Sequence, residues 1–421
     1  MTTSTVPGKQ LSQQDLEVIK RCEVALQKHL KYCRENDWAG YDPYDALNSG
    51  LFKSLPILDH RIPRLVMTQV LKRSPINFRA FMMMPKTQNP KALALFLTSF
   101  LKLSTAQLPD REQLIEYMIG RLIELRSPGE KYWCWGYSFP WQGRSILVPR
   151  GAANLICTLF VANALLDAYE ERQDSRCLAM AVSAAEYILN VLYWTDGDSV
   201  GYCYPLPGVR GHVHNANFLA AALFCRIYKH TGEEKFIAPA LKATRYSVAR
   251  QQENGSWMYG EDKTQQWVDN FHTGYNLSGL LSISRDLKTT EFDSSIRRGF
   301  EFYQSNFFLK DGAVKYFHDR TYPLDTHCVS QSMITLVEFK DFDPGNISLA
   351  CSVFQWCMDH MWSEKGFFYY RVLPFYTIRT SYMRWTQVWM FFAMATLLSE
   401  SGVGVQEASP ALPSPVAVER R

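Results

Sequence analysis

Apolar side chains recur every three or four residues along most of this sequence. In the segment 154–171, for example, Leu155, Leu159 and Leu166 share one face of a helix. No stretch alternates apolar and polar residues over several strands, so a sheet-based domain is not expected. The pattern predicts helices at about 13–35, 59–73, 89–104, 110–127, 150–172, 174–194, 213–231, 234–252, 270–287, 289–308, 325–340, 344–362 and 382–400.

A glycine followed by aromatic residues recurs through the second half of the chain. Gly201, Gly255, Gly312 and Gly366 are separated by 54, 57 and 54 residues, and each interval holds two predicted helices. The loops that carry these glycines are long and rich in aromatic and charged residues, whereas the opposite turns are short. Helical hairpins with one elaborated end favour a closed ring over an open superhelix. The predicted fold is therefore all-α, an (α/α) toroid of about six helical hairpins in a single domain.

The repeat also sets the expected domain boundaries. Residues 12–400 form the toroid domain, with N-terminal hairpins and an aromatic loop at 12–105 and regular hairpin repeats at 106–400. The segments 1–11 and 401–421 are rich in Ser, Pro and Gly with few large apolar groups, which predicts a disordered N-terminus and a disordered C-terminal tail.

Composition narrows the partners and the compartment. With 45 basic and 41 acidic residues the net charge is +4, which gives no global attraction to nucleic acid or to an anionic membrane. The sequence shows no signal-peptide pattern and no apolar run long enough to span a bilayer. Ten scattered cysteines without CxxC pairs are typical of buried free thiols. We expect a cytoplasmic protein with no nucleic-acid partner and no membrane span.

Polar side chains fall at matching positions in four repeats, 13 to 18 residues after each glycine. Equivalent positions in a closed ring converge at one end of its axis, so these groups predict a site there. The competing interpretations are helix capping for the two aspartates and a structural role for the histidines. The eight residues are His214, Asn215, Asp269, His272, Asp325, His327, Tyr382 and Arg384.

Aromatic and arginine side chains lie in the same loops. Aromatic rings either fill the wedges between hairpins or offer flat faces to a sugar ring, and a guanidinium fork matches a carboxylate or a phosphate. Each arginine taken singly is also explained as a surface or capping residue. The expected substrate-binding residues are Trp141, Arg144, Arg150, His214, Asn215, Trp257, Tyr259, Trp267, Tyr382, Arg384 and Trp385.

Metal and cofactor chemistry finds little support. His212, His214 and the later His and Asp residues offer nitrogen and oxygen ligands, but no HExxH or paired-cysteine spacing accompanies them. A GxSxG elbow, a phosphate loop and a dinucleotide fingerprint are also missing from the sequence. No metal and no other cofactor is predicted.

Two resemblances add to this pattern. The segment QQENGSWMYGED at 251–262 resembles the QW-type repeat of triterpene cyclases, and the hairpins look like the toroid shared by terpenoid cyclases, prenyltransferases and six-hairpin glycosidases. The DxDD acid motif of squalene-type cyclases is absent. The segments GYDPYDALNS at 40–49, WVDNFHTGYNL at 267–277 and PLDTHCVSQS at 323–332 resemble a bacterial family of unassigned reaction from cell-surface polysaccharide biosynthesis clusters.

That second resemblance covers about residues 38–400 and implies the fold and a polysaccharide pathway. Some members of the family carry the label delta-aminolevulinic acid dehydratase. That dehydratase is a TIM barrel with Schiff-base lysines, and this chain lacks the alternation of strands and helices that a barrel needs. The label therefore does not fit this sequence.

Three classes of function remain open. The first is a carbohydrate-active enzyme working on a cell-surface polysaccharide or its precursor, with other polysaccharide-assembly proteins as possible partners. The second is a non-catalytic glycan-binding or assembly protein. The third is an enzyme like a terpenoid cyclase or a prenyltransferase, whose acid or diphosphate-binding motif is not evident.

Within the first class, two chemistries compete. Glycoside hydrolysis needs two carboxylates, for which Asp269 and Asp325 lead and Glu261 or Asp262 stand in reserve. Proton transfer of the uronate epimerase or lyase type needs an acid, a base and a cation that neutralises the carboxylate. The groups for that chemistry are His272, Tyr275 and His327, with Arg384 or Arg150 as the cation.

The loop at 40–49 fits the hairpin repeat poorly. Its Asp42, Tyr44 and Asp45 are expected either to form the floor or plug of the pocket or to belong to an aromatic loop that closes the ring.

Overall fold

Six helices stand side by side as the inner wall of a ring. The computed structural model describes residues 11–50, 54, 59–143 and 146–400 of the 421-residue chain. Each inner helix packs against the next, and the last packs against the first. The inner helices are α4 (Pro90–Lys102), α6 (Leu155–Arg172), α8 (His214–Thr231), α10 (Asn270–Leu287), α12 (Thr326–Glu338) and α14 (Val388–Glu400).

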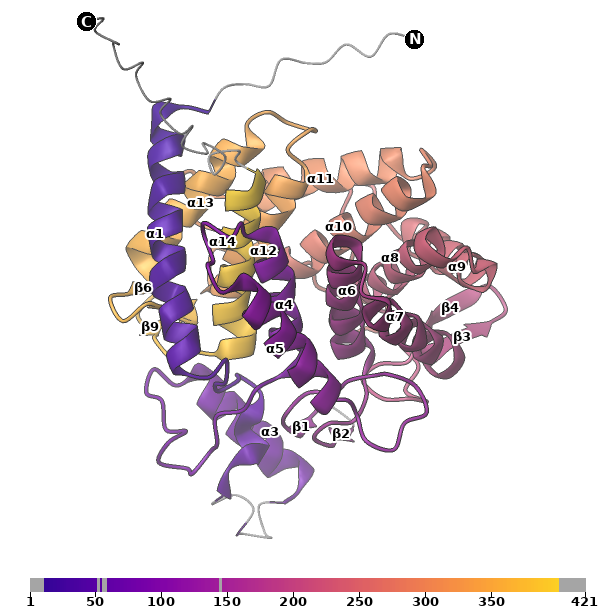
Figure 1. Ribbon diagram of the computed structural model, residues 1–421, viewed down its shortest axis with the longest axis horizontal. Helices are drawn as coiled ribbons and strands as arrows, with labels where there is room; N and C mark the ends of the chain where they lie inside the picture. The colour runs from indigo at the N-terminus through magenta and orange to yellow at the C-terminus, as the bar shows by residue number, and fades with distance from the viewer. Residues whose placement is uncertain (1–10, 51–53, 55–58, 144–145, 401–421) are drawn as a thin grey trace, which may run out of the picture.

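A second layer of helices covers the outside of this ring. Five of them, α5 (Arg111–Glu124), α7 (Ser175–Tyr187), α9 (Ile237–Val248), α11 (Asp293–Phe307) and α13 (Asn346–Met361), each pack against the inner helix that precedes them. The sixth place is taken by α1 (Gln13–Glu35), which packs against α14 and α13 (Figure 1). The prediction of an (α/α) toroid of six hairpins is confirmed, and its closing hairpin joins the first and last helices of the described chain.

Side-chain caps fix where four of the inner helices begin. Asn89, Asn154, Asp269 and Asp325 each accept a backbone N–H from the first turn of α4, α6, α10 and α12, respectively. A capping side chain satisfies donors that have no partner within the helix. The capping role that the sequence allowed for both aspartates is confirmed.

Three of the four repeat glycines occupy one structural position. Gly255, Gly312 and Gly366 have φ angles of +90°, +92° and +86°, a region that side chains rarely adopt. A Cβ at these residues would lie 2.3, 2.5 and 2.7 Å from a backbone oxygen of α11, α13 and α1. The glycines therefore let each of these loops pack tightly against the next outer helix. Gly201 differs, because it lies in a strand.

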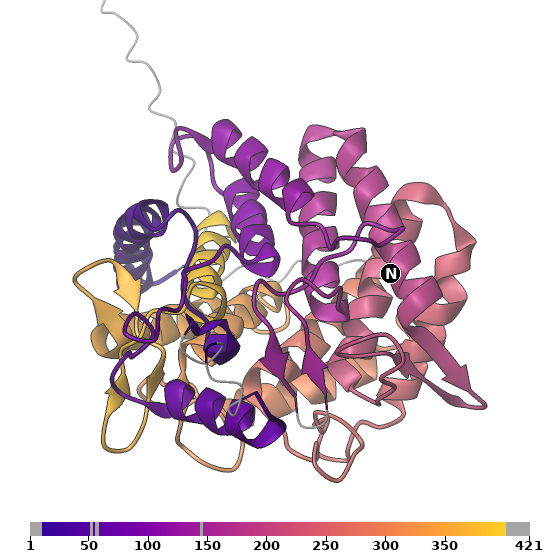
Figure 2. The ribbon, with the colours of Figure 1, turned by 90° about the horizontal axis from the view of Figure 1, so that it is seen from below.

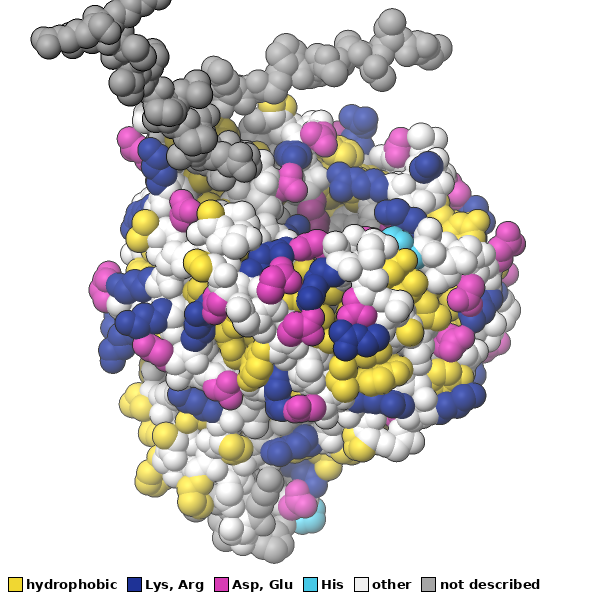
Figure 3. Space-filling model, viewed as in Figure 1, with side chains coloured by type: hydrophobic (Ala, Val, Ile, Leu, Met, Phe, Trp, Pro, Cys, Tyr) yellow, Lys and Arg dark blue, Asp and Glu magenta, His cyan; other side chains and the backbone are white. Residues whose placement is uncertain are grey.

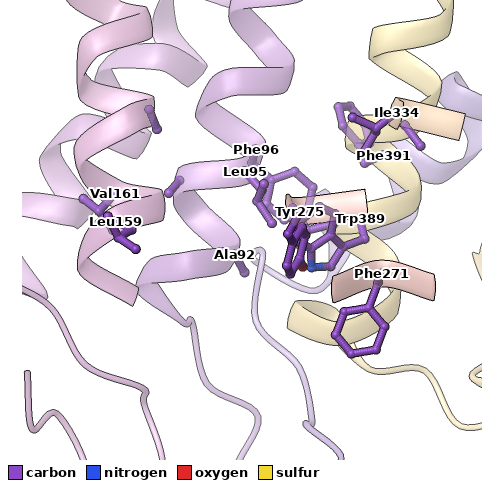
Figure 4. Close-up of a cluster of buried hydrophobic side chains, with 14 of the residues drawn as sticks. Ala92, Leu95, Phe96, Leu159, Val161, Phe271, Tyr275, Ile334, Trp389 and Phe391 are labelled. Carbon is purple, nitrogen blue, oxygen red and sulfur yellow. The ribbon is translucent and has the colours of Figure 1, made fainter. Parts of the chain in front are cut away.

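The core fills the space inside and between the two layers. Helix α14 is buried on nearly all sides, since it lies between α1, α4 and α12. Figure 4 shows Tyr275 and Trp389 together in the middle of the buried cluster, with Phe271 below them. All ten cysteines are buried and free, as the sequence predicts.

Short strands lie in the loops at one end of the ring. They form antiparallel pairs β1–β2, β3–β4 and β6–β7 and one three-stranded sheet in the order β5–β8–β9. Most span only two residues, too few for an alternating pattern to appear in the sequence. Their bounds are β1 (Trp141–Gln142), β2 (Leu147–Val148), β3 (Tyr193–Asp196), β4 (Ser199–Tyr202), β5 (Leu324–Asp325), β6 (Trp362–Ser363), β7 (Phe367–Phe368), β8 (Arg371–Val372) and β9 (Thr377–Ile378).

The end with β1 and β2 also carries α3 (Arg61–Arg73) and the short helix η1 (Asp45–Asn48); it is the lower end in Figure 1 and faces the viewer in Figure 2. We call it the rim. Acidic and basic side chains are mixed over the face drawn in Figure 3. Among the described helices none is both long and apolar enough to cross a membrane.

Two of the expected boundaries can be compared with this architecture. The division at 105/106 falls between α4 and α5, which pack against each other as one hairpin. The predicted disordered segments, 1–11 and 401–421, lie outside the described residues except for Leu11.

Candidate functional site

A cavity of about 610 Å³ opens at the rim, inside the ring. The N-terminal turns of the inner helices contribute to its wall, together with the π-helical turn η5 (Met383–Gln387) that leads into α14. Rim loops and α3 supply the rest. The helical residues that line it are Lys91 of α4, Ile156 of α6, Asn215 and Ala216 of α8, Phe271, His272 and Tyr275 of α10, His327 of α12, and Arg384 and Trp385 of η5.

Asp269 and His272 form a carboxylate–histidine pair on the wall of this cavity. His272 Nδ1 donates to Asp269 Oδ2 at 2.8 Å, and the backbone N–H of His272 donates to Oδ1 at 3.0 Å. Trp267 Nε1 donates to Oδ2 as well, at 2.8 Å. In the neutral ring, the proton that the carboxylate accepts is on Nδ1, and Nε2 then keeps its lone pair. Nε2 has no hydrogen-bond partner among the described residues, so it is free to accept a proton from a ligand.

Tyr275 and His327 form a second proton-carrying pair beside the first. His327 Nδ1 lies 3.1 Å from the carbonyl oxygen of Trp385, which only accepts, so Nδ1 donates. Nε2 of the neutral ring then accepts from the Tyr275 hydroxyl at 2.7 Å. Burial lowers the pKa of His327 well below its ordinary value, and the charge of Lys91 lowers it further. Burial raises the pKa of Tyr275, so at neutral pH the phenol keeps its proton.

Asp325 lies behind the cavity wall rather than on it. The side chain is fully buried and its Oδ2 accepts two hydrogen bonds from Arg371, at 2.8 and 2.5 Å. Its Oδ1 accepts from the backbone of His327 at 2.9 Å and from Trp385 Nε1 at 3.1 Å. Asp325 thus orients two residues of the wall and does not reach the cavity. Among the described residues, Asp269 is the one carboxylate that lines it.

Arg384 joins the loop at 40–49 to the end of the chain. Its Nε and Nη2 donate to the two oxygens of Asp42 at 2.6 and 2.8 Å, and both side chains are buried. Nη1 donates to no described residue, and the side chain lines the cavity. Two of the guanidinium's nitrogens are therefore fixed by the loop, and the third remains for a ligand.

Among the described residues of the loop at 40–49, one lines the cavity. Tyr44 lines the cavity and accepts a hydrogen bond from Lys72 of α3 at 2.6 Å. Behind it, Arg79 donates to Asp45 at 2.9 Å in a buried ion pair. Burial raises the pKa of Asp45 to about 6 although Arg79 opposes the shift.

Several other predicted residues reach the same cavity. They are Trp141, Asn215, Tyr259, Trp267 and Trp385. The rings of Tyr259 and Trp267 are stacked, with centroids 4.7 Å apart, and Tyr259 also packs against His272 at 4.5 Å. These rings hold the imidazole of His272 in place and give the cavity flat apolar faces.

The remaining predicted residues do not line it. Trp257 is a core residue whose Nε1 donates to the carbonyl oxygen of Ser247, and Tyr382 is fully buried against Tyr370. His214 is buried and does not line the cavity. Arg150 is exposed and belongs to another groove.

Two contacts explain the places of His214 and Arg150. The Nδ1 of His214 lies 3.2 Å from Ser247 Oγ, and burial lowers the pKa of the imidazole to about 4. Arg150 donates to Asn48 at 2.6 Å. Arg144 lies outside the described residues.

Three basic residues of the cavity were missed by the sequence analysis: Lys72, Arg73 and Lys91. A signal for Lys91 was present, since this lysine stands at the start of the otherwise apolar run 92–97 on an inner helix. The other two belong to α3, which the hairpin repeat does not include. No three His, Cys, Asp or Glu side chains of the described residues are grouped so that they could hold a metal ion.

No protein-family model and no curated protein sequence matches this chain. Solved structures do match in fold. Cellobiose 2-epimerase from Spirochaeta thermophila superposes with a TM-score of 0.57 over 75% of this chain and 86% of its own, at 13% identity. A polysaccharide lyase gives 0.53 over 92% and 97% at 12% identity. The GH76 α-mannanase of Bacteroides thetaiotaomicron gives 0.54 over 74% and 86% at 11% identity.

At these identities the similarity establishes the fold alone. The chain is similar to toroids of the six-hairpin type, as the sequence predicts, and its reaction has to be inferred from its own cavity.

Proposed function

We propose that this protein is a carbohydrate-active enzyme that moves a proton at a sugar carbon next to a carbonyl or carboxylate group, as an epimerase, isomerase or lyase does. The observation that carries the proposal is the free Nε2 of His272, held by Asp269, on the same cavity wall as the Tyr275–His327 pair. The names of the fold neighbours support a saccharide as substrate. The resemblance to polysaccharide-cluster proteins supports a cell-surface polysaccharide or its cytoplasmic precursor as its source.

In the proposed reaction His272 is the base. Its Nε2 takes the proton from the carbon, and the electron pair of that C–H bond moves into the adjacent carbonyl group to give an enolate. The positive charge that develops on the imidazole is stabilised by Asp269, which accepts from Nδ1. Return of a proton to the other face of the same carbon gives an epimer, whereas loss of a neighbouring oxygen substituent gives an unsaturated product.

Tyr275 and His327 supply the second proton position. A substrate hydroxyl that donates to the Tyr275 oxygen passes its proton on while Tyr275 gives its own proton to Nε2 of His327. The reverse transfer protonates an alkoxide. Such a relay suits the opening of a sugar ring or the departure of a hydroxyl-linked group.

Hydrolysis and cyclisation are less well supported by this cavity. A glycosidase needs two carboxylates across the scissile bond, and among the described residues only Asp269 lines the cavity. Asp325 is bound by Arg371, and the reserve residue Glu261 pairs with Arg250 at 2.7 Å. A terpenoid cyclase needs a strong acid, yet Asp269 already accepts hydrogen bonds from His272 and Trp267.

Solvent exchange tests the proposal. The purified protein is incubated in D₂O with reducing sugars, uronic acids and uronate-containing oligosaccharides, and deuterium at carbon is followed by NMR and mass spectrometry. We expect deuterium at one carbon of one class of sugar, and a loss of about 100-fold or more in His272→Asn. Tyr275→Phe should lower the rate as well, whereas His360→Asn, on the exposed face of α13, should not.

Two other results would each assign a different function. New reducing ends without deuterium uptake would indicate hydrolysis. Binding of a glycan that undergoes no change would indicate a glycan-binding protein, which the aromatic lining of the cavity also suits.

A further inference from the structure

Lys91 is a buried lysine whose amine forms no ion pair with a described residue. The residue is 3% exposed, and its Nζ donates no hydrogen bond and forms no ion pair with any described residue. It is surrounded by rings instead: Nζ lies 3.9 Å from the centroid of Phe160, 5.1 Å from Trp389 and 5.8 Å from Tyr275. Burial lowers the pKa of this amine well below its ordinary value. A buried ammonium without a partner is costly, so packing alone does not account for a lysine here.

The position of Lys91 in its helix makes the cost larger. It is the second residue of α4, where the unpaired N–H groups already give the helix a positive end. The N-terminal turns of α6, α8, α10 and α12 line the same cavity, so their positive ends add to the field at this point. Nothing in the packing of α4 requires an amine at the first turn, because its neighbours Ala92 and Leu93 are apolar and fully buried.

Basic side chains outnumber carboxylates among the described residues that line the cavity. Four basic side chains line the cavity, Lys72, Arg73, Lys91 and Arg384, against one lining carboxylate, Asp269; Arg384 is in addition paired with Asp42, which does not line the cavity. Arg384 keeps Nη1 without an acceptor among the described residues, and its charge is one of the causes that lower the pKa of Lys91. Lys91 and Arg384 thus share a wall, and the nearby carboxylate of Asp42, which does not line the cavity, pairs with Arg384 and forms no ion pair with Lys91.

We propose that the ligand supplies an anion to this wall: the cavity binds an anionic sugar, and Lys91 together with Nη1 of Arg384 holds its carboxylate or phosphate. The inference rests on the proposed function and deepens it by naming the substrate class. It assigns to Lys91 the selection of charged over neutral sugars. The carboxylate of a uronic acid and a phosphate ester offer the same chemistry to these two groups.

Calorimetric titration of the full chain tests the inference with three matched ligands: D-glucuronate, D-glucose 6-phosphate and D-glucose. We expect at least one of the two anionic sugars to bind about tenfold or more tightly than glucose, because a charge-assisted hydrogen bond is worth that much. The tighter of the two identifies the group as carboxylate or phosphate. Lys91→Met should abolish the preference and Lys91→Arg should keep part of it, whereas Lys310→Met, on the surface, should change nothing.

The outcomes separate this inference from the proposed reaction. His272→Asn should lose exchange at carbon yet keep the preference for the anionic sugar, since Lys91 and Arg384 are unchanged. Equal affinity for all three sugars, no binding of any of them, or an unchanged preference in a folded Lys91→Met protein would overturn the inference. Circular dichroism of each variant establishes that it is folded.

Discussion

His214 makes the stability of this protein depend on pH in a way that can be calculated. The imidazole is buried at the first residue of α8, where the positive end of the helix also disfavours an added proton. Its pKa falls from an ordinary 6.5 to about 4, with burial as the largest cause. The unfolded chain therefore binds a proton below pH 6.5 that the folded chain does not take up until pH 4. Stability from this group is complete above pH 7 and is lost as the pH falls.

The size of the effect follows from the two pKa values. At pH 5 the unfolded His214 is almost fully protonated and the folded one about one-tenth protonated. The difference lowers the free energy of unfolding by about 2 kcal/mol relative to pH 8. Asparagine at this position presents a polar group to Ser247 in place of Nδ1 and does not titrate. The His214→Asn protein should therefore lose about 2 kcal/mol less than the parent protein between the two pH values.

Urea unfolding followed by far-ultraviolet circular dichroism at pH 8 and pH 5 measures both losses. Burial also lowers the pKa values of His29 and His327, but those groups are common to both proteins and cancel in the comparison. His360→Asn serves as the matched control on an exposed face. An equal loss in the parent and the His214→Asn protein would refute the reasoning, because it would mean that the buried imidazole accepts a proton at no cost.

Two further predictions concern stability. Gly366→Ala should lower the free energy of unfolding by about 2 kcal/mol or more, since it places a Cβ 2.7 Å from the backbone oxygen of Lys28 at a φ of +86°. Gly129→Ala, also at positive φ but with open space around it, should lower it less. Equal losses for the two variants in urea unfolding would contradict the packing role of Gly366. Asp42→Ala should lower the free energy of unfolding by about 3 kcal/mol or more, because it leaves Arg384 buried without its partner. Adding Arg384→Met should recover part of that loss in urea unfolding but abolish any preference for anionic sugars. A double variant no more stable than Asp42→Ala would argue against a paired charge.

The sequence was most informative where the chain repeats itself. A glycine with two helices per interval predicted both the ring and the end where polar residues meet, and Asp269, His272, Tyr275 and His327 do lie near one another there. Equivalent positions in a repeat do not show whether a side chain faces the cavity or the core behind it. Asp325 and Asp269 cap equivalent helices, yet Arg371 draws the first away from the cavity.

What the sequence could not supply were contacts between distant segments. Arg384 and Asp42 are 342 residues apart in the chain, and their ion pair brings the irregular loop at 40–49 into the cavity wall. Lys91 could have been noticed as a lone lysine in an apolar helix. That its amine forms no ion pair with a described residue, which is the reason to expect an anionic ligand, can be seen only in the folded ring.

The pairing of α1 with α14 has a consequence for the order in which the protein is made. Hairpins α4–α5 through α12–α13 each join consecutive helices and can pair as they leave the ribosome. Helix α1 precedes the ring helices in the chain, but its principal partner is the last of them, α14. Its apolar face, which includes Ile19, Leu26 and Leu30, is left without that partner until residues 388–400 have been translated. A chain arrested before residue 388 would therefore leave this apolar face exposed to solvent.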